Sequence, residues 1–459
     1  MTPINLDPRG GTTHAGAVPT SSLFDQLQPD GASPVPVTFN GTGALPSAFA
    51  VTDLAAASIA GAAAEVAALA GAPWVTVDRR LASWWFLTTI RPHGWELPPV
   101  WDAVAGDYAA ADGWIRLHTN APHHRAAALA VLGVPAQREL VATAVADWTA
   151  AALEDAVVAA GGCAAAMRSL ESWTVHPQGV AVAAEPLIDW SPADGSPRAS
   201  GRSVDPARPL AGVRVLDLTR VLAGPVATRF LAGYGADVLR LDPPDWDEAA
   251  VVPEVTRGKR CARVDLGTAD GRATFDALLA EADVLVHGYR SDALARLGLD
   301  AAHRRRVRPG LVDVALDAYG WTGPWSTRRG FDSLVQMSAG IAHEGQRVSG
   351  RDRPTPLPAQ ALDHATGYLM AAAAVRGLRA GTGGSARLSL ARTALLLTGA
   401  ARGSFDDTLL AASEADEEPT MERTPWGAAH RLRSPVTIPG VEAVWDRPAT
   451  ALGSSPPRW

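Results

Sequence analysis

Lysine is nearly absent from this chain. Of its 41 basic Lys and Arg residues, Lys259 is the one lysine, and 48 acidic residues give a formal net charge of −7. This net negative charge, with basic residues spread along the chain, argues against nucleic acid or an anionic membrane as the main partner. Almost every contact to an anionic ligand must therefore come from arginine side chains or backbone N–H groups.

Cysteine and strongly hydrophobic runs are also scarce. The two cysteines, Cys163 and Cys261, stand far apart and fit no disulfide or metal spacing. The N-terminus has neither a basic start nor an apolar core, and the longest apolar stretch, 54–72, is mostly alanine and too weakly hydrophobic for a membrane span. We therefore expect a disulfide-free cytoplasmic protein without a membrane partner.

Several common catalytic and binding motifs are missing. The loop after the first strand of the C-terminal part reads L-T-R-V-L-A-G-P, without G-x-G-x-x-G, so a dinucleotide with its ribose on Asp242 is disfavoured. No phosphate-binding P-loop and no G-x-S-x-G nucleophile elbow occurs. His123 and His124 are adjacent, and the other histidines lack the i, i+4 spacing of a helical metal site, so no metal is expected.

The pattern of apolar and polar residues divides the chain into four parts. Residues 1–48 form an irregular lead-in, 49–190 a helix-rich part, 191–210 a Pro- and Gly-rich linker, and 211–459 an alternation of strands and helices. Strands separated by helices of 10–15 residues are typical of a parallel sheet covered by helices, so we predict an α/β fold with a Rossmann-like large domain. In the second part, A-A-D-G-W-I-R-L-H at 110–118 predicts a hairpin with a turn at Asp112-Gly113.

The strand and helix predictions within the last part can be given as ranges. Strands are expected at 213–218, 238–242, 262–266, 283–289 and 311–316, and helices at 225–234, 269–282 and 363–378.

One sequence segment occurs in both halves of the chain. An apolar pair, an aspartate and an alanine-rich helix occur at Asp53 and again at Asp363, and a short strand-like run ending in arginine follows each time. Arg80 follows Asp53 by 27 residues and Arg392 follows Asp363 by 29. The shared order and spacing indicate a duplicated segment.

Asp363 begins a predicted helix, and two roles are open to it. An aspartate at a helix start is usually a cap. The same position surrounds its carboxylate with unpaired N–H groups, which can hold an oxyanion beside an attacking carboxylate.

Residues 212–244, beginning G-V-R-V-L-D-L-T-R-V-L-A-G-P, closely resemble the opening of the family III CoA-transferases, which include the α-methylacyl-CoA racemases. The likeness continues through R-G-K-R-C-A-R-V-D-L, G-F-D-S-L-V-Q-M-S-A-G-I and A-L-D-H-A-T-G-Y-L, and covers about 210–400 and 430–453. Residues 49–190 resemble a partial, rearranged copy that supplies the small domain, and 211–459 the main module with a C-terminal return segment. The resemblance implies a smaller α+β domain beside the Rossmann-like one, arranged as a homodimer or as an intrachain pseudo-dimer.

The resemblance also implies a reaction and a site. The family's nucleophile matches Asp363, which would exchange coenzyme A between an acyl-CoA and a carboxylic acid through an aspartyl-CoA thioester. Asp53 matches it in the partial copy, as a second nucleophile or, as we favour, a relic that caps a helix. The positions that match the family's CoA contacts are Val221, Leu222, Ala223, Lys259, Arg260, Gly288, Tyr289, Arg290, Arg296 and Leu297.

Some positions depart from the family's pattern. Leu222 stands where the transferases often have a polar residue, and Asp317 where a lysine can occur, which weakens attraction for phosphate. The racemases have G-H-D where this chain has Gly330-Phe331-Asp332, and phenylalanine cannot carry a proton, so racemisation or isomerisation is the disfavoured alternative. A non-catalytic CoA-binding homologue is the other alternative. The 15 tryptophans, including Trp84, Trp85 and Trp321, suggest a bulky or apolar acid as substrate.

Overall fold

A seven-stranded sheet forms the centre of the computed structural model, which describes residues 20–27, 33–193, 204–405 and 413–459. All neighbouring strands are parallel except the last pair, so the predicted Rossmann-like parallel sheet is confirmed. In sheet order the strands are β10 (Lys259–Arg263), β9 (Asp237–Asp242), β8 (Arg214–Leu218), β11 (Val284–His287), β12 (Val312–Asp317), β13 (Gly384–Ser389) and β7 (Asp189–Pro192).

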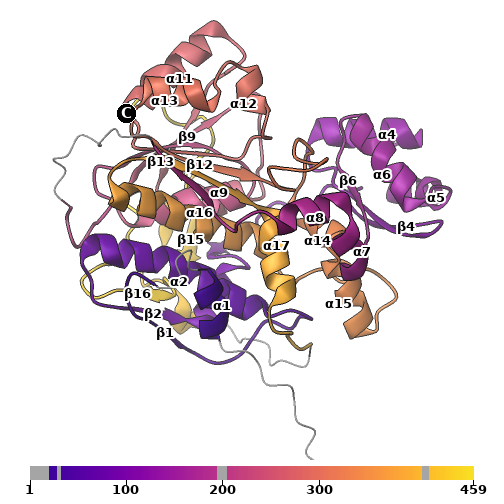
Figure 1. Ribbon diagram of the computed structural model, residues 1–459, viewed down its shortest axis with the longest axis horizontal. Coiled ribbons are helices and arrows are strands. Elements are labelled where there is room, and N and C mark those ends of the chain that lie inside the picture. Colours follow the sequence, from indigo (N-terminus) through magenta and orange to yellow (C-terminus); the bar gives the residue numbers. More distant parts are fainter. Residues whose placement is uncertain (1–19, 28–32, 194–203, 406–412) are drawn as a thin grey trace, which may run out of the picture.

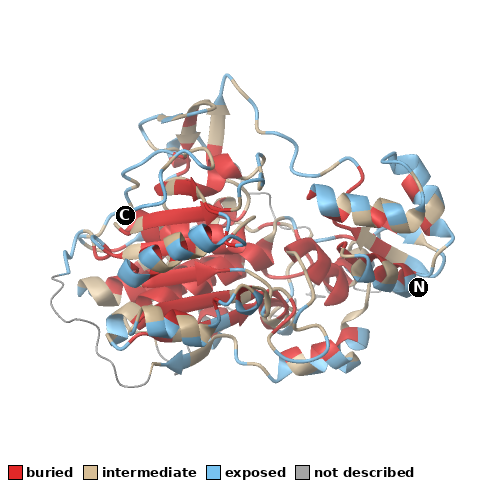
Figure 2. Cartoon of the chain, turned by 90° about the horizontal axis from the view of Figure 1, so that it is seen from above, coloured by how far each residue is buried: buried red, intermediate tan, exposed pale blue. Residues whose placement is uncertain are grey.

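Helices cover both faces of this sheet (Figure 1). Val215, Val238 and Val284 pack against α9 (Ala223–Gly233) and α16 (Ala361–Ala380). Their neighbours in the strands, such as Leu216 and Leu239, pack on the other face, against α11 (Ala269–Glu281). Because both faces are buried, the strands read as continuous hydrophobic runs. Figure 2 shows the buried residues gathered in the sheet and the helices beside it.

Most predicted elements of the large domain occur within a few residues of their expected places. One strand is displaced: 262–266 was expected, whereas β10 covers Lys259–Arg263. The helix predicted at 363–378 is α16, which begins two residues earlier and ends two residues later. Two shorter helices, α12 (Ala293–Arg296) and α13 (Ala301–Val307), lie near α11 on the same side of the sheet (Figure 1).

The longest helices, α16 and α2 (Val51–Ala70), have 20 residues each and pack against one another. Each has its aspartate at the third position, and the residues before them have nearly the same backbone angles, φ −74° and ψ 62° at Ala50 and φ −76° and ψ 63° at Gln360. Glu65 of α2 is buried and accepts hydrogen bonds from Arg376 and Arg379 of α16. The two repeat segments thus lie side by side.

Both segments continue in the same order. Helix α2 leads to β2 (Val75–Asp78) and α3 (Arg79–Trp85), and α16 leads to β13 and α17 (Leu390–Gly399). Strand β2 belongs to a separate sheet with β1 (Val37–Asn40) and β16 (Val436–Thr437). By length and composition alone α2 is apolar enough to cross a membrane, but 78% of its most apolar window is buried in the protein. It is therefore a core helix of this fold.

A small α+β domain lies to one side (Figure 1, right). Its antiparallel sheet of β4 (Gly106–Ala110), β5 (Gly113–Leu117) and β6 (Ala164–Ala166) packs on α4 (Pro122–Leu132), α5 (Arg138–Ala146) and α6 (Ala150–Ala159). The predicted hairpin is β4–β5, and the two residues between its strands are Ala111 and Asp112, one position before the expected turn.

Further short elements connect these parts. They are α1 (Thr20–Gln26), β3 (Ile90–His93), α7 (Leu170–Val175), α8 (Pro177–Ala183), α10 (Val252–Val255), α14 (Asp332–Ser338), α15 (Ile341–Ser349), β14 (Glu422–Thr424) and β15 (Gly427–Arg431). The range 1–48, predicted to be irregular, contains α1 and β1, while 1–19 and 28–32 lie outside the described residues. Of the predicted linker 191–210, the first two residues belong to β7, and 194–203 lie outside the description.

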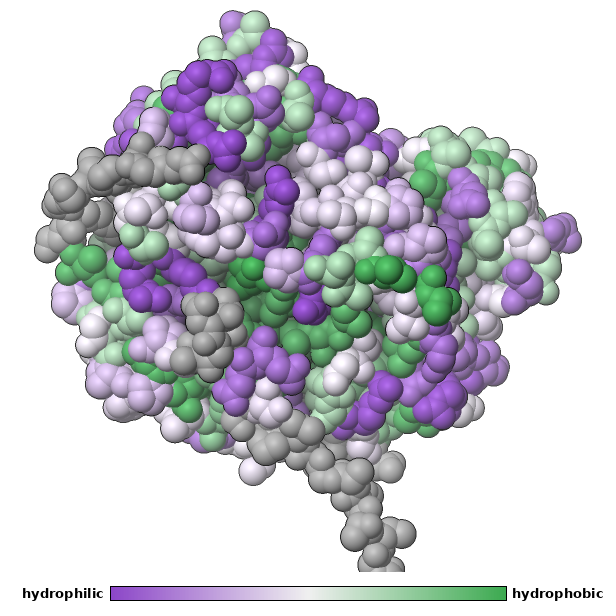
Figure 3. Space-filling view, viewed as in Figure 1, coloured by the Kyte–Doolittle hydropathy of each residue, from purple (hydrophilic) through white to green (hydrophobic). Residues whose placement is uncertain are grey.

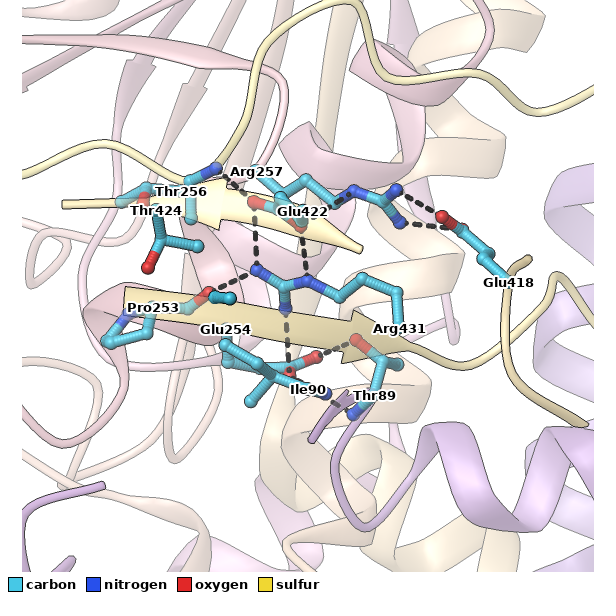
Figure 4. A network of polar contacts seen from close by, with 12 residues as sticks. Thr89, Ile90, Pro253, Glu254, Thr256, Arg257, Glu418, Glu422, Thr424 and Arg431 are labelled. Atoms are coloured by element: carbon cyan, nitrogen blue, oxygen red, sulfur yellow. Dashed lines mark hydrogen bonds and ion pairs between the residues drawn. The ribbon is translucent and has the colours of Figure 1, made fainter. Parts of the chain in front are cut away.

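A buried polar network ties the N-terminal and C-terminal segments to the large domain (Figure 4). Arg431 of β15 is fully buried and donates to Glu422 at 2.5 Å and to the Pro253 carbonyl at 2.7 Å. Glu254 of α10 accepts hydrogen bonds from Thr89 and from the Ile90 N–H. Three segments distant in the sequence are thus joined through charged groups without access to water.

The face of the molecule drawn in Figure 3 carries both hydrophilic and hydrophobic residues. Hydrophobic residues gather near its centre, where Figure 1 shows α16 and α17.

Candidate active site

A cavity of about 400 Å³ opens at the carboxyl ends of the parallel strands. The chain leaves β8 toward β9 on one side, while β11 pairs with β8 on the other, so the sheet order reverses here. Ligands of open α/β sheets bind at such a switch point. Leu218, Gly288 and Asp317, which end or follow β8, β11 and β12, line the cavity.

Asp363, at the third position of α16, lines the same cavity and is only 6% exposed. Burial raises the pKa of its carboxyl well above the usual value, and the nearby carboxyl of Asp332 raises it further. The N–H groups of Leu362 and Asp363 both donate to Asp332 Oδ2, at 2.8 and 3.0 Å. The expectation that these donors are free for an oxyanion is therefore wrong.

Asp332 is thus the cap of α16, although it belongs to α14. It is fully buried, and its other oxygen accepts a hydrogen bond from Gln336 Nε2 at 2.5 Å. Burial raises its pKa to about 6, in spite of the N–H groups that favour its ionised form. Because two buried carboxyl groups share this place, ionisation of one opposes ionisation of the other.

The turn from β8 into α9 has a strained backbone. Val221 has φ 63°, and no other residue except glycine has a positive φ within the described ranges. A β-branched residue rarely adopts this conformation, and such strain clusters at functional sites. The Val221 N–H donates to Glu248 Oε2 at 2.8 Å, which helps to hold the turn.

Close packing places this turn beside Asp363. A Cβ atom added to Gly367, one turn after Asp363, would lie 2.3 Å from the carbonyl oxygen of Ala223. A Cβ atom on Gly224 would similarly lie within 2.2 Å of Thr219. Gly367 therefore allows α16 to approach the start of α9 at the cavity, and Gly224 allows the side chain of Thr219 to pack against the start of α9.

Five of the predicted coenzyme A contacts line the cavity together with Asp363: Val221, Ala223, Gly288, Tyr289 and Arg290. Leu222 is 5% exposed and packs in the hydrophobic core. Leu297 also packs against a hydrophobic cluster, behind Tyr289.

The other three predicted contacts have partners within the fold. Lys259 is fully buried, and its Nζ donates to Asp217 at 3.0 Å and to Thr228 at 2.6 Å. Arg260 forms an ion pair with Asp237 at 2.6 Å, and Arg296 is 70% exposed and paired with Asp292 at 2.5 Å. None of the three lines the cavity, and their role in binding stays a prediction.

Three arginines that sequence reasoning did not single out complete the cationic lining: Arg220, Arg328 and Arg329. Arg220 donates to the Tyr289 hydroxyl at 2.6 Å, and its guanidinium lies 4.8 Å from the ring centres of Tyr289 and Trp246. The guanidinium of Arg290 forms no hydrogen bond or ion pair with any residue that the structure describes. In an arginine-rich chain, no local pattern distinguishes these side chains from solvated surface charges.

Asp317 lines the cavity without bringing a full negative charge. Burial raises its pKa to about 8, although the N–H groups of Tyr319 and Gly320 donate to it at 2.8 and 3.2 Å. Because this pKa lies above neutral pH, the carboxyl is mainly protonated there. The expected repulsion of phosphate by Asp317 is correspondingly small.

Asp53 lies outside this cavity. Its Oδ1 accepts a hydrogen bond from Thr20 at 2.5 Å and one from Arg79 at 2.6 Å. It lines a separate pocket of about 100 Å³ between α1 and the end of α17. Its carboxylate is thus held by a guanidinium, whereas that of Asp363 has no such partner among the described residues.

The described residues form neither a metal site nor a tryptophan-lined substrate pocket of the kind considered from the sequence. Within the described ranges no group of three or more His, Cys, Asp or Glu side chains is arranged to hold a metal ion. Trp84, Trp85 and Trp321 do not line the cavity, in which Trp246 is the one tryptophan among described residues. The reason for expecting a bulky apolar acid is therefore lost.

The model of CoA-transferase family III matches residues 210–431. The probable fatty acyl-CoA transferase Rv3272 of Mycobacterium tuberculosis is 32% identical over 188 residues, 38% of this chain and 47% of that protein. The succinyl-CoA:glutarate CoA-transferase of Mus musculus is 33% identical over 189 residues, 38% of this chain and 42% of that one.

A solved structure of Rv3272 is 32% identical, with a TM-score of 0.38, and the match covers 42% of this chain and 57% of that one. The chain spans about half the length of the curated relatives that it matches. The matched part contains the seven-stranded sheet except β7, together with Asp363 and the cavity-lining turn at Val221.

Proposed function

Because residues 210–431 belong to CoA-transferase family III, we propose that this protein is an acyl-CoA:carboxylate CoA-transferase that works through an aspartyl-CoA thioester on Asp363. The observation that carries the proposal is the position of Asp363. It is a buried carboxyl without a cationic partner, and it lines a cavity that also presents four arginines. The guanidinium group of arginine can donate two parallel hydrogen bonds to a phosphate group of coenzyme A. A carboxylate that is not paired with a cation can act as a nucleophile.

The reaction needs Asp363 in its ionised form. A carboxylate is a weak nucleophile in water, so rate must come from positioning and from stabilisation of the oxyanion. The close approach of α16 to α9 at Gly367 holds the carboxyl beside the Val221 turn. Two covalent steps conserve the thioester's energy. The carboxylate first takes the acyl group as a mixed anhydride and releases the coenzyme A thiolate. The thiolate then attacks the aspartyl carbonyl, which breaks the anhydride bond, releases the donor acid as a carboxylate and leaves the aspartyl-CoA thioester.

We propose that the chain is an intrachain pseudo-dimer, in which α2 takes the place on α16 that a second chain would occupy. The matched aspartate positions and the direct packing of the two helices support this. Asp53 then serves as a structural relic, because Arg79 and Thr20 hold its carboxylate. A net charge of −7 supports a cytoplasmic protein whose partners are acyl-CoA and a carboxylic acid, not a membrane or nucleic acid.

The test is intact-protein mass spectrometry after incubation with a panel of acyl-CoAs, with hydroxylamine added to trap an activated aspartyl group. The wild type and Asp53→Asn are expected to give an adduct that peptide mapping places on Asp363. Asp363→Asn is the matched variant and is expected to give none. An adduct on residue 53 in the wild type would contradict the relic assignment.

The same panel separates the alternatives. Binding of coenzyme A without any adduct or exchange would favour a non-catalytic homologue. Uptake of solvent deuterium at C2 of a 2-methylacyl-CoA, without acyl exchange, would favour a racemase. Either result overturns the proposed transferase activity.

A further inference from the structure

His124 is a second functional group in this cavity, and it comes from the small domain. It is the third residue of α4 and is 4% exposed. It lines the cavity with Asp363, yet neither ring nitrogen has a hydrogen-bond partner among the described residues. A buried polar group without a partner costs free energy, so such a group requires an explanation, for which catalysis is one.

Aromatic packing holds the imidazole in place. The Phe331 ring meets the ring of His124 edge-on, with centroids 5.9 Å apart at an angle of 70°. On its other side Phe331 stacks on His118, at 3.7 Å and 7°. Burial lowers the pKa of His124 to about 4, and the charges of His123 and Arg329 act in the same direction. A neutral imidazole has one N–H donor and adds no charge.

The proposed reaction needs a hydrogen-bond donor for the thioester oxygen, and the N–H groups expected at the start of α16 are occupied. The first N–H groups of α16 are bound to Asp332. The Val221 N–H is bound to Glu248, and Leu222 has no polar atom in its side chain. A tetrahedral oxyanion without a donor would be costly in a site with little water.

We propose that His124 donates a hydrogen bond to the oxyanion that forms when Asp363 attacks the thioester carbonyl. This inference rests on the proposed transferase activity and adds a catalytic residue from the small domain. The carboxylate of Asp363 forms a bond to the carbonyl carbon, and the C=O electron pair moves to oxygen, where the imidazole N–H holds it. Return of that pair breaks the C–S bond and releases the coenzyme A thiolate, with no net proton transfer.

The variants His124→Phe and His124→Gln test this assignment. Phenylalanine fills the space without a donor, whereas glutamine restores an N–H group. We expect His124→Phe to lower kcat by about 100-fold, as loss of one oxyanion donor does, with a much smaller rise in KM. His124→Gln should recover at least about tenfold of that loss. The matched control is His118→Phe, since His118 also packs on Phe331 but does not line the cavity, and it should stay within about threefold of wild type.

A binding measurement supports the test without turnover. The probes are the ketone analogue of acetyl-CoA, with CH₂ in place of the thioester sulfur, and S-ethyl-CoA, which has no carbonyl. Calorimetry should show His124→Phe weakening the ketone analogue about fivefold or more, the effect of one lost hydrogen bond, and leaving S-ethyl-CoA unchanged.

Three outcomes would overturn the inference. If His124→Phe keeps the wild-type kcat, the donors are the first N–H groups of α9 and His124 is not required. If exchange of solvent deuterium at C2 occurs and depends on His124, the imidazole carries a proton instead. If the wild type binds neither probe, the proposed function itself fails. That outcome can be told apart from the first one, in which the His124→Phe variant is as active as the wild type.

Discussion

Two buried carboxyl groups, on Asp363 and Asp332, determine when the site can react. Burial raises the pKa of each, and each disfavours ionisation of the other. In the proposed mechanism the reactive form of Asp363 is the anion, so the rate should rise with pH as this carboxyl loses its proton.

Asp332→Asn removes one of these charges and keeps an oxygen that can accept the N–H groups of α16. The pKa of Asp363 should fall, and the acidic limb of the pH–rate profile should move to lower pH, by about one unit. The measurement is kcat/KM between about pH 4 and pH 8. A limb that stays in place would mean that another group controls the rate.

Asp363→Asn should abolish exchange and stabilise the fold. The folded pKa of Asp363 is raised, so ionisation opposes folding, and stability is lost as pH rises through that pKa. At neutral pH the variant should gain on the order of 1 kcal/mol in the free energy of unfolding. At acidic pH, urea titration should give a smaller gain in the free energy of unfolding. A gain of equal size in acid would assign the effect to packing.

At the scale of elements, the contact between α16 and α9 positions Asp363, the nucleophile of the proposed mechanism. Gly367→Ala would place a methyl group 2.3 Å from the Ala223 carbonyl oxygen, so the helices must separate. We expect a cost of about 1–3 kcal/mol in stability and a loss of about 100-fold in kcat, because small displacements of a nucleophile are costly. Thermal unfolding and steady-state exchange measure the two effects.

Gly61→Ala is the matched control. This glycine lies in the middle of α2, and a Cβ atom there would meet nothing within 4 Å. The variant should be more stable by about 0.5–1 kcal/mol, since alanine favours a helix, and should exchange coenzyme A at the wild-type rate. Equal losses in both variants would contradict the role of the contact at Gly367.

The network around α10 joins elements that are distant in the sequence. Burial opposes ionisation of Glu254, but the guanidinium groups of Arg229 and Arg431 hold its pKa well below the usual range. Its contribution to stability is therefore present above the ordinary pKa of glutamate and is lost only as pH falls below it.

Glu254→Gln should destabilise the protein by about 3–5 kcal/mol, because it leaves the buried guanidinium of Arg229 without its counter-charge and removes one of the two carboxylates that face Arg431. Denaturant titration at neutral pH measures the change. Glu281→Gln is the control, since Glu281 is 58% exposed and pairs with Arg214 at the surface. That substitution should cost no more than about 1 kcal/mol, and a similar cost for both would contradict the network's importance.

At the scale of the whole molecule, one chain carries both repeat helices. Helix α16 buries 16 of its 20 residues against α2, α9 and the sheet. No face of it is left for the equivalent helix of another chain. Light scattering should therefore give a monomer of 47.8 kDa. A stable dimer would contradict the intrachain pseudo-dimer and would require a different interface.

Local patterns determined much of the fold. The spacing of apolar residues and the turn residues, which act over a few positions, predict three features. These are the continuous hydrophobic strands of the large domain, the helix at Asp363 and the β4–β5 hairpin. The family resemblance likewise identified Asp363 and the turn at Val221, because both are short contiguous segments.

Tertiary structure alone decided what surrounds Asp363. The N–H groups at its helix start were expected to be free, but Asp332, 31 residues earlier in the sequence, occupies them. Lys259 matched a ligand contact, yet burial next to Asp217 gives it a structural partner. His124 is one of two adjacent histidines in the sequence, and the small domain brings it to the cavity. Sequence patterns report propensity and periodicity, whereas burial, charge pairing and access to a cavity depend on residues distant along the chain.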